Sequence, residues 1–299
     1  MHIREILSGD DPKFSFEYFP PKSAAAGEAL FRTISELQLF DPAFVSVTYG
    51  AGGTTREATH GLVLRLLREI KVNTTPHLTC VGHSEREISE LLESYAEAGV
   101  SNILALRGDA PKSSVVTPAG DFTHAADLVS FIRRFSEKHK HDFGIGVAGF
   151  PEGHPATPNR MLEMDRLKEK IDAGADYICT QLFFDNHDFF DFQDRCELNG
   201  IGTPILAGIM PITSGSKMSC MADLAAGSRF PAKLQRALAR GNGDEAAIRR
   251  IGIHYAAAQC SDLLNNGVKG IHFYTLNQSS ATVEIFRQLG LRSFPILLS

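Results

Sequence analysis

The sequence lacks the features of secreted, disulfide-stapled and membrane-spanning chains. Its five cysteines, at positions 80, 179, 196, 220 and 260, include no Cys-x-x-Cys pair, which argues against a disulfide framework and against a structural zinc site. No run of about 18 apolar residues is present, and the N-terminus has no apolar signal core. We therefore expect a cytoplasmic protein with no metal site and no membrane association.

Basic residues are also too scattered for a nucleic-acid-binding protein. The net charge is −5 at pH 7 and no stripe of Lys and Arg is visible, whereas nucleic-acid-binding surfaces concentrate positive charge. The composition is otherwise globular, with 43% hydrophobic and 22% charged residues. A chain of 299 residues can bury a substantial core, in one large domain or two smaller ones.

Segments with strand character alternate with segments of helical character along the whole chain. Eight are rich in apolar, β-branched and aromatic residues: Phe14–Pro20, Phe44–Gly50, Thr74–Cys80, Asn102–Asp109, Gly144–Pro151, Tyr177–Asp185, Pro204–Ile212 and Gly270–Asn277. Helical segments include Arg56–Ile70, Ser84–Ala98, Asn159–Ala173 and Asp244–Asn266, with another near Phe230–Arg240. This alternation predicts parallel strands joined by helices. We predict an α/β fold, a single (β/α)8 TIM barrel over residues 1–299 with extra helices before the last strand.

Several predicted helices carry start and stop signals. Ser84 and Glu87 have the spacing of a capping box. Gly99, Gly174 and Gly267 stand where helices of this pattern end. These signals support the helix boundaries given above.

Polar residues gather at the predicted C-terminal ends of the strands, where barrel active sites are built. The strand bodies are apolar, but their ends carry Glu17, Thr48, His77, Arg107, Asp109, Glu152, His154, Gln181 and Asn277. The pattern predicts a wide polar mouth that holds a large, hydrogen-bonding ligand.

Glu17 is the most informative of these residues. Strand alternation places Ser15, Glu17 and Phe19 on one face and the other aromatic residues of the segment on the opposite face. A carboxyl on the inner wall of a barrel loses solvation, which favours its protonated form and suits a general acid. The alternative is a buried Glu in an ion pair with Arg or Lys.

Two other polar residues have two alternative roles each. Asp109 leads into a loop rich in Gly, Pro and Ser, and it either forms a turn or accepts two N–H donors from a heterocycle. Gln181 lies in an apolar segment, where it is either a polar link in the core or a ligand contact. Thr48 and His77 are weaker candidates, because threonine is common in strands and a single histidine is usually structural.

Some motifs match a known pattern only in letters. Gly144–Gly149 reads G-x-G-x-x-G, but it lies inside a predicted strand rather than at a strand-to-helix turn, so we reject a dinucleotide-binding motif. We expect these small residues to let a ligand lie flat against the barrel wall. Ser214–Lys217 spells S-x-x-K without its companion motifs. No lysine lies in a predicted strand body, which disfavours a Schiff-base aldolase.

Together, eight colinear motifs resemble the methylenetetrahydrofolate reductase family, in its bacterial form with the catalytic barrel only. They are Phe16–Pro21, Phe44–Gly50, Pro76–Cys80, Leu106–Asp109, Phe150–Pro155, Asp172–Asp176, Thr180–Phe184 and His272–Asn277. The resemblance implies a homo-oligomer that binds FAD and takes hydride from NADH or NADPH. It also implies ping-pong reduction of 5,10-methylenetetrahydrofolate to 5-methyltetrahydrofolate for methionine synthesis.

The resemblance assigns roles to individual residues. Glu17 matches the general acid that opens the five-membered ring of the folate to an iminium. Asp109 matches a carboxylate that binds the N–H edge of the pterin and disfavours an anionic reduced flavin. Gln181 matches an amide that contacts the folate. Positions that contact FAD in the family correspond to Thr48, Tyr49, Ala51, His77, Arg107, Gly108, Asp109, His124, Ala125, Phe150, His154, Glu163, Arg166 and Lys170, of which Arg107, His154 and Lys170 suit the pyrophosphate.

The chain departs from the family pattern at some of these positions. Gln278 replaces an arginine that contacts folate, and Lys217 either attracts a glutamate carboxylate of the folate or is solvated. His124 stands where Tyr or Phe is common, Phe150 where Tyr is frequent, and Glu163 and Arg166 also differ. Two alternatives therefore stay open: a related flavin or deazaflavin oxidoreductase with another donor or substrate, and a catalytically silent binding or assembly subunit.

Overall fold

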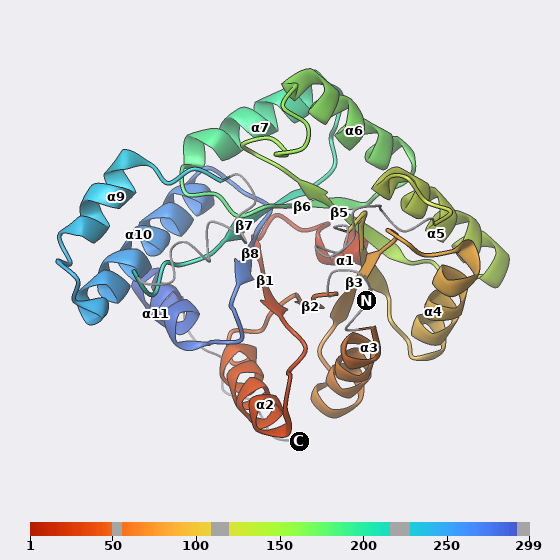
Figure 1. Ribbon diagram of the computed structural model, residues 1–299, viewed down its shortest axis with the longest axis horizontal. Helices are drawn as coiled ribbons and strands as arrows, with labels where there is room; N and C mark the ends of the chain where they lie inside the picture. The colour runs from red at the N-terminus through yellow and green to blue at the C-terminus, as the bar shows by residue number, and fades with distance from the viewer. Residues whose placement is uncertain (50–55, 109–119, 216–227, 292–299) are drawn as a thin grey trace.

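The computed structural model describes residues 1–49, 56–108, 120–215 and 228–291. Eight parallel strands close into a barrel in the order of the sequence (Figure 1). Their bounds are β1 Lys13–Tyr18, β2 Phe44–Val47, β3 Thr74–Thr79, β4 Asn102–Leu106, β5 Gly144–Gly149, β6 Tyr177–Thr180, β7 Ile205–Ile209 and β8 Gly270–Tyr274. β8 pairs with both β7 and β1, which closes the ring. The predicted (β/α)8 barrel is confirmed.

Helices surround this barrel (Figure 1). They are α1 Ile3–Ile6, α2 Ala24–Gln38, α3 Arg56–Arg65 with the π-helical segment η2 Leu66–Ile70, α4 Glu85–Glu97, α5 Ala125–His139, α6 Arg160–Asp172, α7 Asn186–Leu198, α9 Ala232–Ala239, α10 Glu245–Asn265 and α11 Ser280–Gln288. α9 precedes α10 and β8, which confirms an extra helix before the last strand. None of the helices in the described ranges is long and apolar enough to span a membrane.

Capping signals in the sequence place the helix ends correctly. Ser84 caps α4 and forms the predicted capping box with Glu87. Asn159 and Asp244 accept backbone N–H groups at the starts of α6 and α10. Gly99, which follows α4, adopts a positive φ of 80°. These ends are fixed locally, because a side chain or a left-handed glycine satisfies the unpaired backbone groups there.

The strands are shorter than the sequence suggests. The segment predicted from Tyr177 to Asp185 forms a strand only to Thr180. Beyond it, Leu182 and Phe184 are buried against α9 and α10, and Phe183 stacks on Phe189 of α7. These side chains are apolar because helices cover them, so hydrophobicity continues after the ladder of strand hydrogen bonds has ended.

The glycine run Gly144–Gly149 is strand β5, as expected from its context, but its glycines do not make room for a ligand. A Cβ on Gly146 would lie 2.2 Å from Cζ of Tyr177, and one on Gly149 would lie 2.8 Å from Cζ of Phe192. The glycines themselves therefore offer no open space, because protein side chains fill it, but Ala148 of the same run lines the cavity at the C-terminal end of the barrel, so contact between a ligand and this wall stays a prediction.

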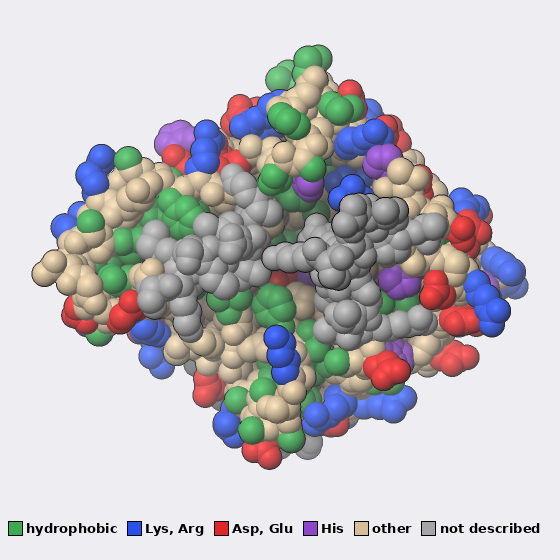
Figure 2. Space-filling view, viewed as in Figure 1, with side chains coloured by type: hydrophobic (Ala, Val, Ile, Leu, Met, Phe, Trp, Pro, Cys, Tyr) green, Lys and Arg blue, Asp and Glu red, His purple; other side chains and the backbone are tan. Residues whose placement is uncertain are grey.

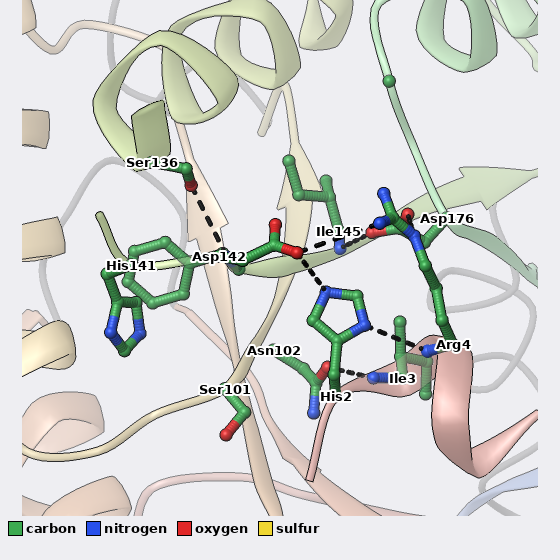
Figure 3. Close-up of polar contacts among 12 residues, drawn as sticks. His2, Ile3, Arg4, Ser101, Asn102, Ser136, His141, Asp142, Ile145 and Asp176 are labelled. Atoms are coloured by element: carbon green, nitrogen blue, oxygen red, sulfur yellow. Dashed lines mark hydrogen bonds and ion pairs between the residues drawn. The ribbon is translucent and has the colours of Figure 1, made fainter. Parts of the chain in front are cut away.

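The N-terminal end of the barrel is closed by α1. Ile3, Ile6 and Leu7 are buried among residues of the strand bottoms. The Ile3 backbone N–H donates to Oδ1 of Asn102 at 2.7 Å. Polar contacts tie the same segment to the strand and helix ends around it (Figure 3). This end of the barrel is sealed, so any ligand must reach the interior from the opposite end.

The sealing contacts converge on Asp176, whose side chain is 3% exposed. Its carboxylate accepts from Arg4 Nε at 2.6 Å and from the Ile145 N–H at 2.7 Å (Figure 3). Arg133 Nη2 also donates to it, at 2.6 Å. Arg133 also donates to the carbonyl oxygens of Phe143 and Gly174, at 2.7 Å for each. Each charge in this group therefore has a partner.

Candidate functional site

A cavity of about 560 Å³ opens at the C-terminal end of the strands. It extends from the inner wall of the barrel across β4 and β5 to the N-terminal part of α5 and to α6. Twelve residues predicted for the site line it: Glu17, His77, Arg107, Gly108, His124, Ala125, Phe150, His154, Glu163, Arg166, Lys170 and Gln181. The fold thus brings together residues that lie up to 164 positions apart in sequence, from 17 to 181.

Glu17 lies on the inner wall of β1. The neighbouring aromatic residues Phe14 and Phe16 face outward, with their rings 4.9 and 6.0 Å from that of Phe286 in α11. Because side chains alternate along a strand, Glu17 faces the barrel interior and lines the cavity. Glu17 is only 5% exposed. This is the orientation that the sequence predicts.

Two buried imidazoles flank the Glu17 carboxyl. Its Oε2 lies 3.5 Å from Nε2 of His77 and 3.8 Å from Nε2 of His272. Within the described part of the chain, Glu17 has no ion pair with Arg or Lys. His272 in turn contacts Ser15 Oγ at 2.7 Å and Ser46 Oγ at 3.3 Å. The alternative role of Glu17, a buried carboxylate in an ion pair with Arg or Lys, therefore has no support among these residues.

His77 is a neutral group near pH 7. Burial lowers its pKa to about 4, and the neighbouring His272 lowers the pKa further, while Glu17 opposes the shift. Its Nε2 is buried and makes no hydrogen bond to any residue in the described ranges. A buried polar atom of this kind costs about 1–3 kcal/mol when it has no partner. The site thus holds a buried carboxyl beside a polar atom that a ligand can satisfy.

Positive charge marks the other end of the cavity. Arg107 follows β4, and Lys170 of α6 donates to the Ala148 carbonyl oxygen at 2.6 Å. Burial lowers the pKa of Lys170 to about 8, although the carboxylate of Glu163 opposes this shift. The first N–H groups of α5, at Ala125 and Ala126, have no partner within the helix. Together these groups form a binding region for an anion.

Some predicted site residues do not line the cavity or lie outside the described residues. Thr48 and Tyr49 are not among the lining residues; the Tyr49 hydroxyl instead lies 3.4 Å from Nε2 of His83. Gln278 is exposed, beyond the end of β8. Asp109, Ala51 and Lys217 lie outside the described residues. The roles assigned to this whole group stay predictions.

Sequence reasoning missed three residues on the inner wall. His272 lies against Glu17, as described above, and Tyr274 lines the cavity and donates to the Thr180 carbonyl oxygen at 2.7 Å. Cys179 also lines the cavity, and burial raises the pKa of its thiol, so it stays protonated. The alternation that was applied to β1 would have placed His272 and Tyr274 together on the inner face of β8.

Glu152, another strand-end candidate, faces a different partner. Its Oε2 accepts from the backbone N–H and from Nε of Arg229, at 2.7 and 3.0 Å. Arg229 Nη2 also contacts Asp188 Oδ1 at 2.5 Å. Glu152 is not among the cavity-lining residues. Through Arg229 it connects the loop after β5 to Asp188 of α7.

No group of three or more His, Cys, Asp and Glu side chains converges to hold a metal ion in the ranges that the structure describes. A cavity lined by apolar and polar side chains that includes a buried carboxyl, at the C-terminal end of a (β/α)8 barrel, is typical of barrel enzymes that bind a cofactor or small molecule.

Comparison with known proteins identifies the family. The chain belongs to the methylenetetrahydrofolate reductase family, whose model matches residues 2–290. It is 35% identical to 5,10-methylenetetrahydrofolate reductase of Escherichia coli, over 93% of this chain and 90% of that protein. It is 38% identical to methylenetetrahydrofolate reductase (NADH) 1 of Arabidopsis thaliana, over 97% of this chain. The chain spans about half the length of that plant relative, 50%.

Solved structures share the fold at low sequence identity. An uncharacterized Clostridium thermocellum protein that binds two copies of 5-methyl-5,6,7,8-tetrahydrofolic acid aligns with a TM-score of 0.63 at 14% identity, over 97% of this chain and 99% of that one. A 2,3-dimethylmalate lyase aligns with a TM-score of 0.54 at 10% identity, over 99% of this chain and 90% of that one. At such identities the likeness concerns the barrel alone.

Proposed function

We propose that this protein reduces 5,10-methylenetetrahydrofolate to 5-methyltetrahydrofolate in the cytoplasm, with FAD as its bound cofactor and NADH or NADPH as the reductant. Membership of the family supports the reaction. The single structural observation that carries the proposal is the Glu17 carboxyl, buried on the inner wall and open to the cavity between two imidazoles.

The residues around the cavity fit FAD. Its volume of about 560 Å³ lies within the range of about 300–1,000 Å³ that is usual for cofactor and small-molecule sites. Arg107, Lys170 and the N-terminus of α5 would hold the pyrophosphate. The orphaned Nε2 of His77 would gain a partner from the ring system. When bound, FAD supplies hydride acceptance and donation.

The protein's own residues provide the acid chemistry. Glu17 would deliver a proton to the substrate nitrogen whose bond to the methylene carbon breaks, and would keep that proton out of bulk solvent beforehand. His77, which is neutral near pH 7 because burial lowers its pKa, does not neutralise the carboxyl permanently. Gln181, which lines the same cavity, would orient the pterin; its Oε1 accepts from the Leu182 N–H at 2.9 Å.

One alternative is a related flavin or deazaflavin oxidoreductase that uses another donor or substrate. The observation that favours it is Gln278, which replaces an arginine of the family pattern and is exposed rather than cavity-lining. A binding subunit without activity is disfavoured, because such a protein has no evident need for a buried acid that has no Arg or Lys partner in the described part of the chain.

Anaerobic half-reactions test the proposal. The purified protein is loaded with FAD and mixed with NADH or with NADPH, and bleaching of the oxidised-flavin absorbance is followed. The reduced protein is then mixed with 5,10-methylenetetrahydrofolate. We expect bleaching by at least one nicotinamide and recovery with the folate, with 5-methyltetrahydrofolate as product.

Each negative outcome has a distinct meaning. Bleaching without recovery by the folate would point to a different substrate on the same scaffold. Failure to retain FAD would remove the cofactor assignment and favour a silent binding protein.

A further inference from the structure

A second cavity, of about 760 Å³, lies on the outer side of the barrel. It is bounded by α9, α10 and the start of α7, at the left of the molecule in Figure 1. No lining residue is shared with the cavity at the barrel mouth. Figure 2 shows hydrophobic side chains exposed between α9 and α10, with basic side chains near them.

The floor of this cavity is apolar. Phe184, Ile251 and Tyr255 line it, together with Pro231 and Ala237. The Tyr255 hydroxyl donates to the Phe184 carbonyl oxygen at 2.7 Å, so the polar end of this side chain is engaged within the protein. A flat apolar group would therefore meet rings and aliphatic carbon here.

The rim is positively charged. Lys233, Arg240 and Arg250 line the cavity and are exposed, and none of the three forms an ion pair with any residue in the described ranges. The two acidic lining residues are engaged locally. Asp185 pairs with His187 at 2.8 Å, and Asp262 accepts from Asn186 Nδ2 at 2.6 Å. Three cationic lining side chains against two carboxylates leave a positive balance at the cavity, which favours an anion.

Asn186 supplies a third, independent observation. Its Nδ2 donates to Asp262 and to the Gln259 carbonyl oxygen at 3.0 Å, which fixes the orientation of the amide. Its Oδ1 is buried and has no hydrogen-bond partner among the residues that the structure describes. A buried acceptor left in this state costs about 1–3 kcal/mol, so a donor on a bound molecule would stabilise it.

We propose that the cavity between α9, α10 and α7 is a second ligand site, which binds a small organic anion with a flat apolar body. The apolar floor takes the body, the rim of Lys233, Arg240 and Arg250 takes the anionic group, and Asn186 Oδ1 accepts a hydrogen bond from the ligand. The volume of about 760 Å³ falls within the range of about 300–1,000 Å³ for small-molecule sites. Binding there does not depend on the reaction proposed above.

Calorimetric titration with 8-anilinonaphthalene-1-sulfonate tests the proposal. This probe carries an aromatic body, an N–H donor and one sulfonate. FAD is added in excess to occupy the cavity at the barrel mouth, so that the probe does not bind there. We expect saturable binding at one site. N-phenyl-1-naphthylamine, which has the same body without the sulfonate, should bind about tenfold more weakly, equivalent to about 1.4 kcal/mol.

Variants locate the binding. The double substitution Arg240→Glu and Arg250→Glu should weaken sulfonate binding at least about tenfold, and Ala258→Trp, at an exposed lining position of α10, should abolish it by filling the space. Arg236→Glu is the matched control, because Arg236 is also exposed on α9 but does not line the cavity.

Three results would overturn the assignment. They are absence of saturable binding by the unmodified protein, equal affinity for the charged and uncharged probes, and equal weakening by Arg236→Glu and the double substitution. Circular dichroism of each variant separates loss of binding from loss of folding.

Discussion

The two ends of the barrel treat buried charge in opposite ways. At the N-terminal end, Asp176 accepts three hydrogen bonds, two of them from arginine side chains. At the C-terminal end, Glu17 is almost as buried, yet its charged contacts within the described ranges are two imidazoles, at 3.5 and 3.8 Å. Among these residues, Asp176 is compensated by permanent cations and Glu17 is not.

This difference separates stability from chemistry. A buried charge with complete partners holds a structure in place, but it cannot easily change its protonation state, because the partners would lose their counter-charge. A carboxyl without such partners can act as an acid without leaving a buried cation uncompensated. The same residue type is therefore suited to different work at opposite ends of one barrel.

Glu17→Gln gives the largest expected effect. The amide has nearly the same shape but cannot donate a proton as an acid, so reoxidation of the reduced holoenzyme by 5,10-methylenetetrahydrofolate should slow by about 10²–10⁴-fold. Reduction by the nicotinamide should stay within about twofold of the unmodified rate, since that step needs no acid of this kind. Anaerobic stopped-flow absorbance measures both steps.

The unaffected step is the internal control for Glu17→Gln. If both half-reactions slowed together, Glu17 would be acting on flavin binding or on the fold. If neither changed, the acid would have to be another residue.

Asp176→Asn should destabilise the N-terminal end of the barrel. Removing one partner of a buried ion pair leaves Arg133, whose side chain is 19% exposed, short of compensation, so the free energy of unfolding should fall by about 3–5 kcal/mol. Urea unfolding followed by circular dichroism measures it. Asp172→Asn is the control, because Asp172 pairs with Lys168 at 2.8 Å but is 61% exposed, and it should cost less than about 1 kcal/mol. Equal losses in the two variants would show that Asp176 is no more structural than a surface acid.

The sequence predicts the inner wall better than the mouth. Strand period two and the apolar bodies of the strands place Glu17 inside, and local caps such as Ser84 and Asn159 set helix ends within a residue. These features depend on neighbours a few residues away. His272 required the same alternation on the last strand, and its contact with Glu17 depends on closure of β8 onto β1.

Other positions depend on tertiary packing, which one sequence does not encode locally. The space beside Gly146 is taken by Tyr177 from the next strand. The apolar residues Leu182 and Phe184 continue past the end of β6 because α9 and α10 cover them. Gln278 follows a strand whose inner residues reach the cavity, yet it is exposed. The first two outcomes are decided by elements distant in the sequence, and nothing in the structure explains the third.

Lys170 is partly buried and borders the cavity like Glu17, and its substitution gives the smallest of the expected effects. It is a cation at the cavity whose pKa burial lowers from 10.5 to about 8, with Glu163 opposing the shift. In the unfolded chain this lysine stays protonated up to about pH 10. Below about pH 8, Lys170 therefore lowers the free energy of unfolding, because its charged form is less stable in the folded protein. This loss of stability is relieved as the pH rises from about 8 to 10.5. The bound pyrophosphate of FAD would favour the charged form, so FAD affinity should weaken as the pH rises above about 8.

We expect a loss of FAD affinity of about tenfold between pH 7 and pH 10 in the unmodified protein and a smaller loss in Lys170→Met, which should bind FAD more weakly at pH 7. Lys168→Met, on the same helix but paired with Asp172 at the surface, should keep the unmodified profile. Equilibrium dialysis against FAD at several pH values measures all three proteins, and identical pH profiles for them would show that Lys170 does not contact the cofactor.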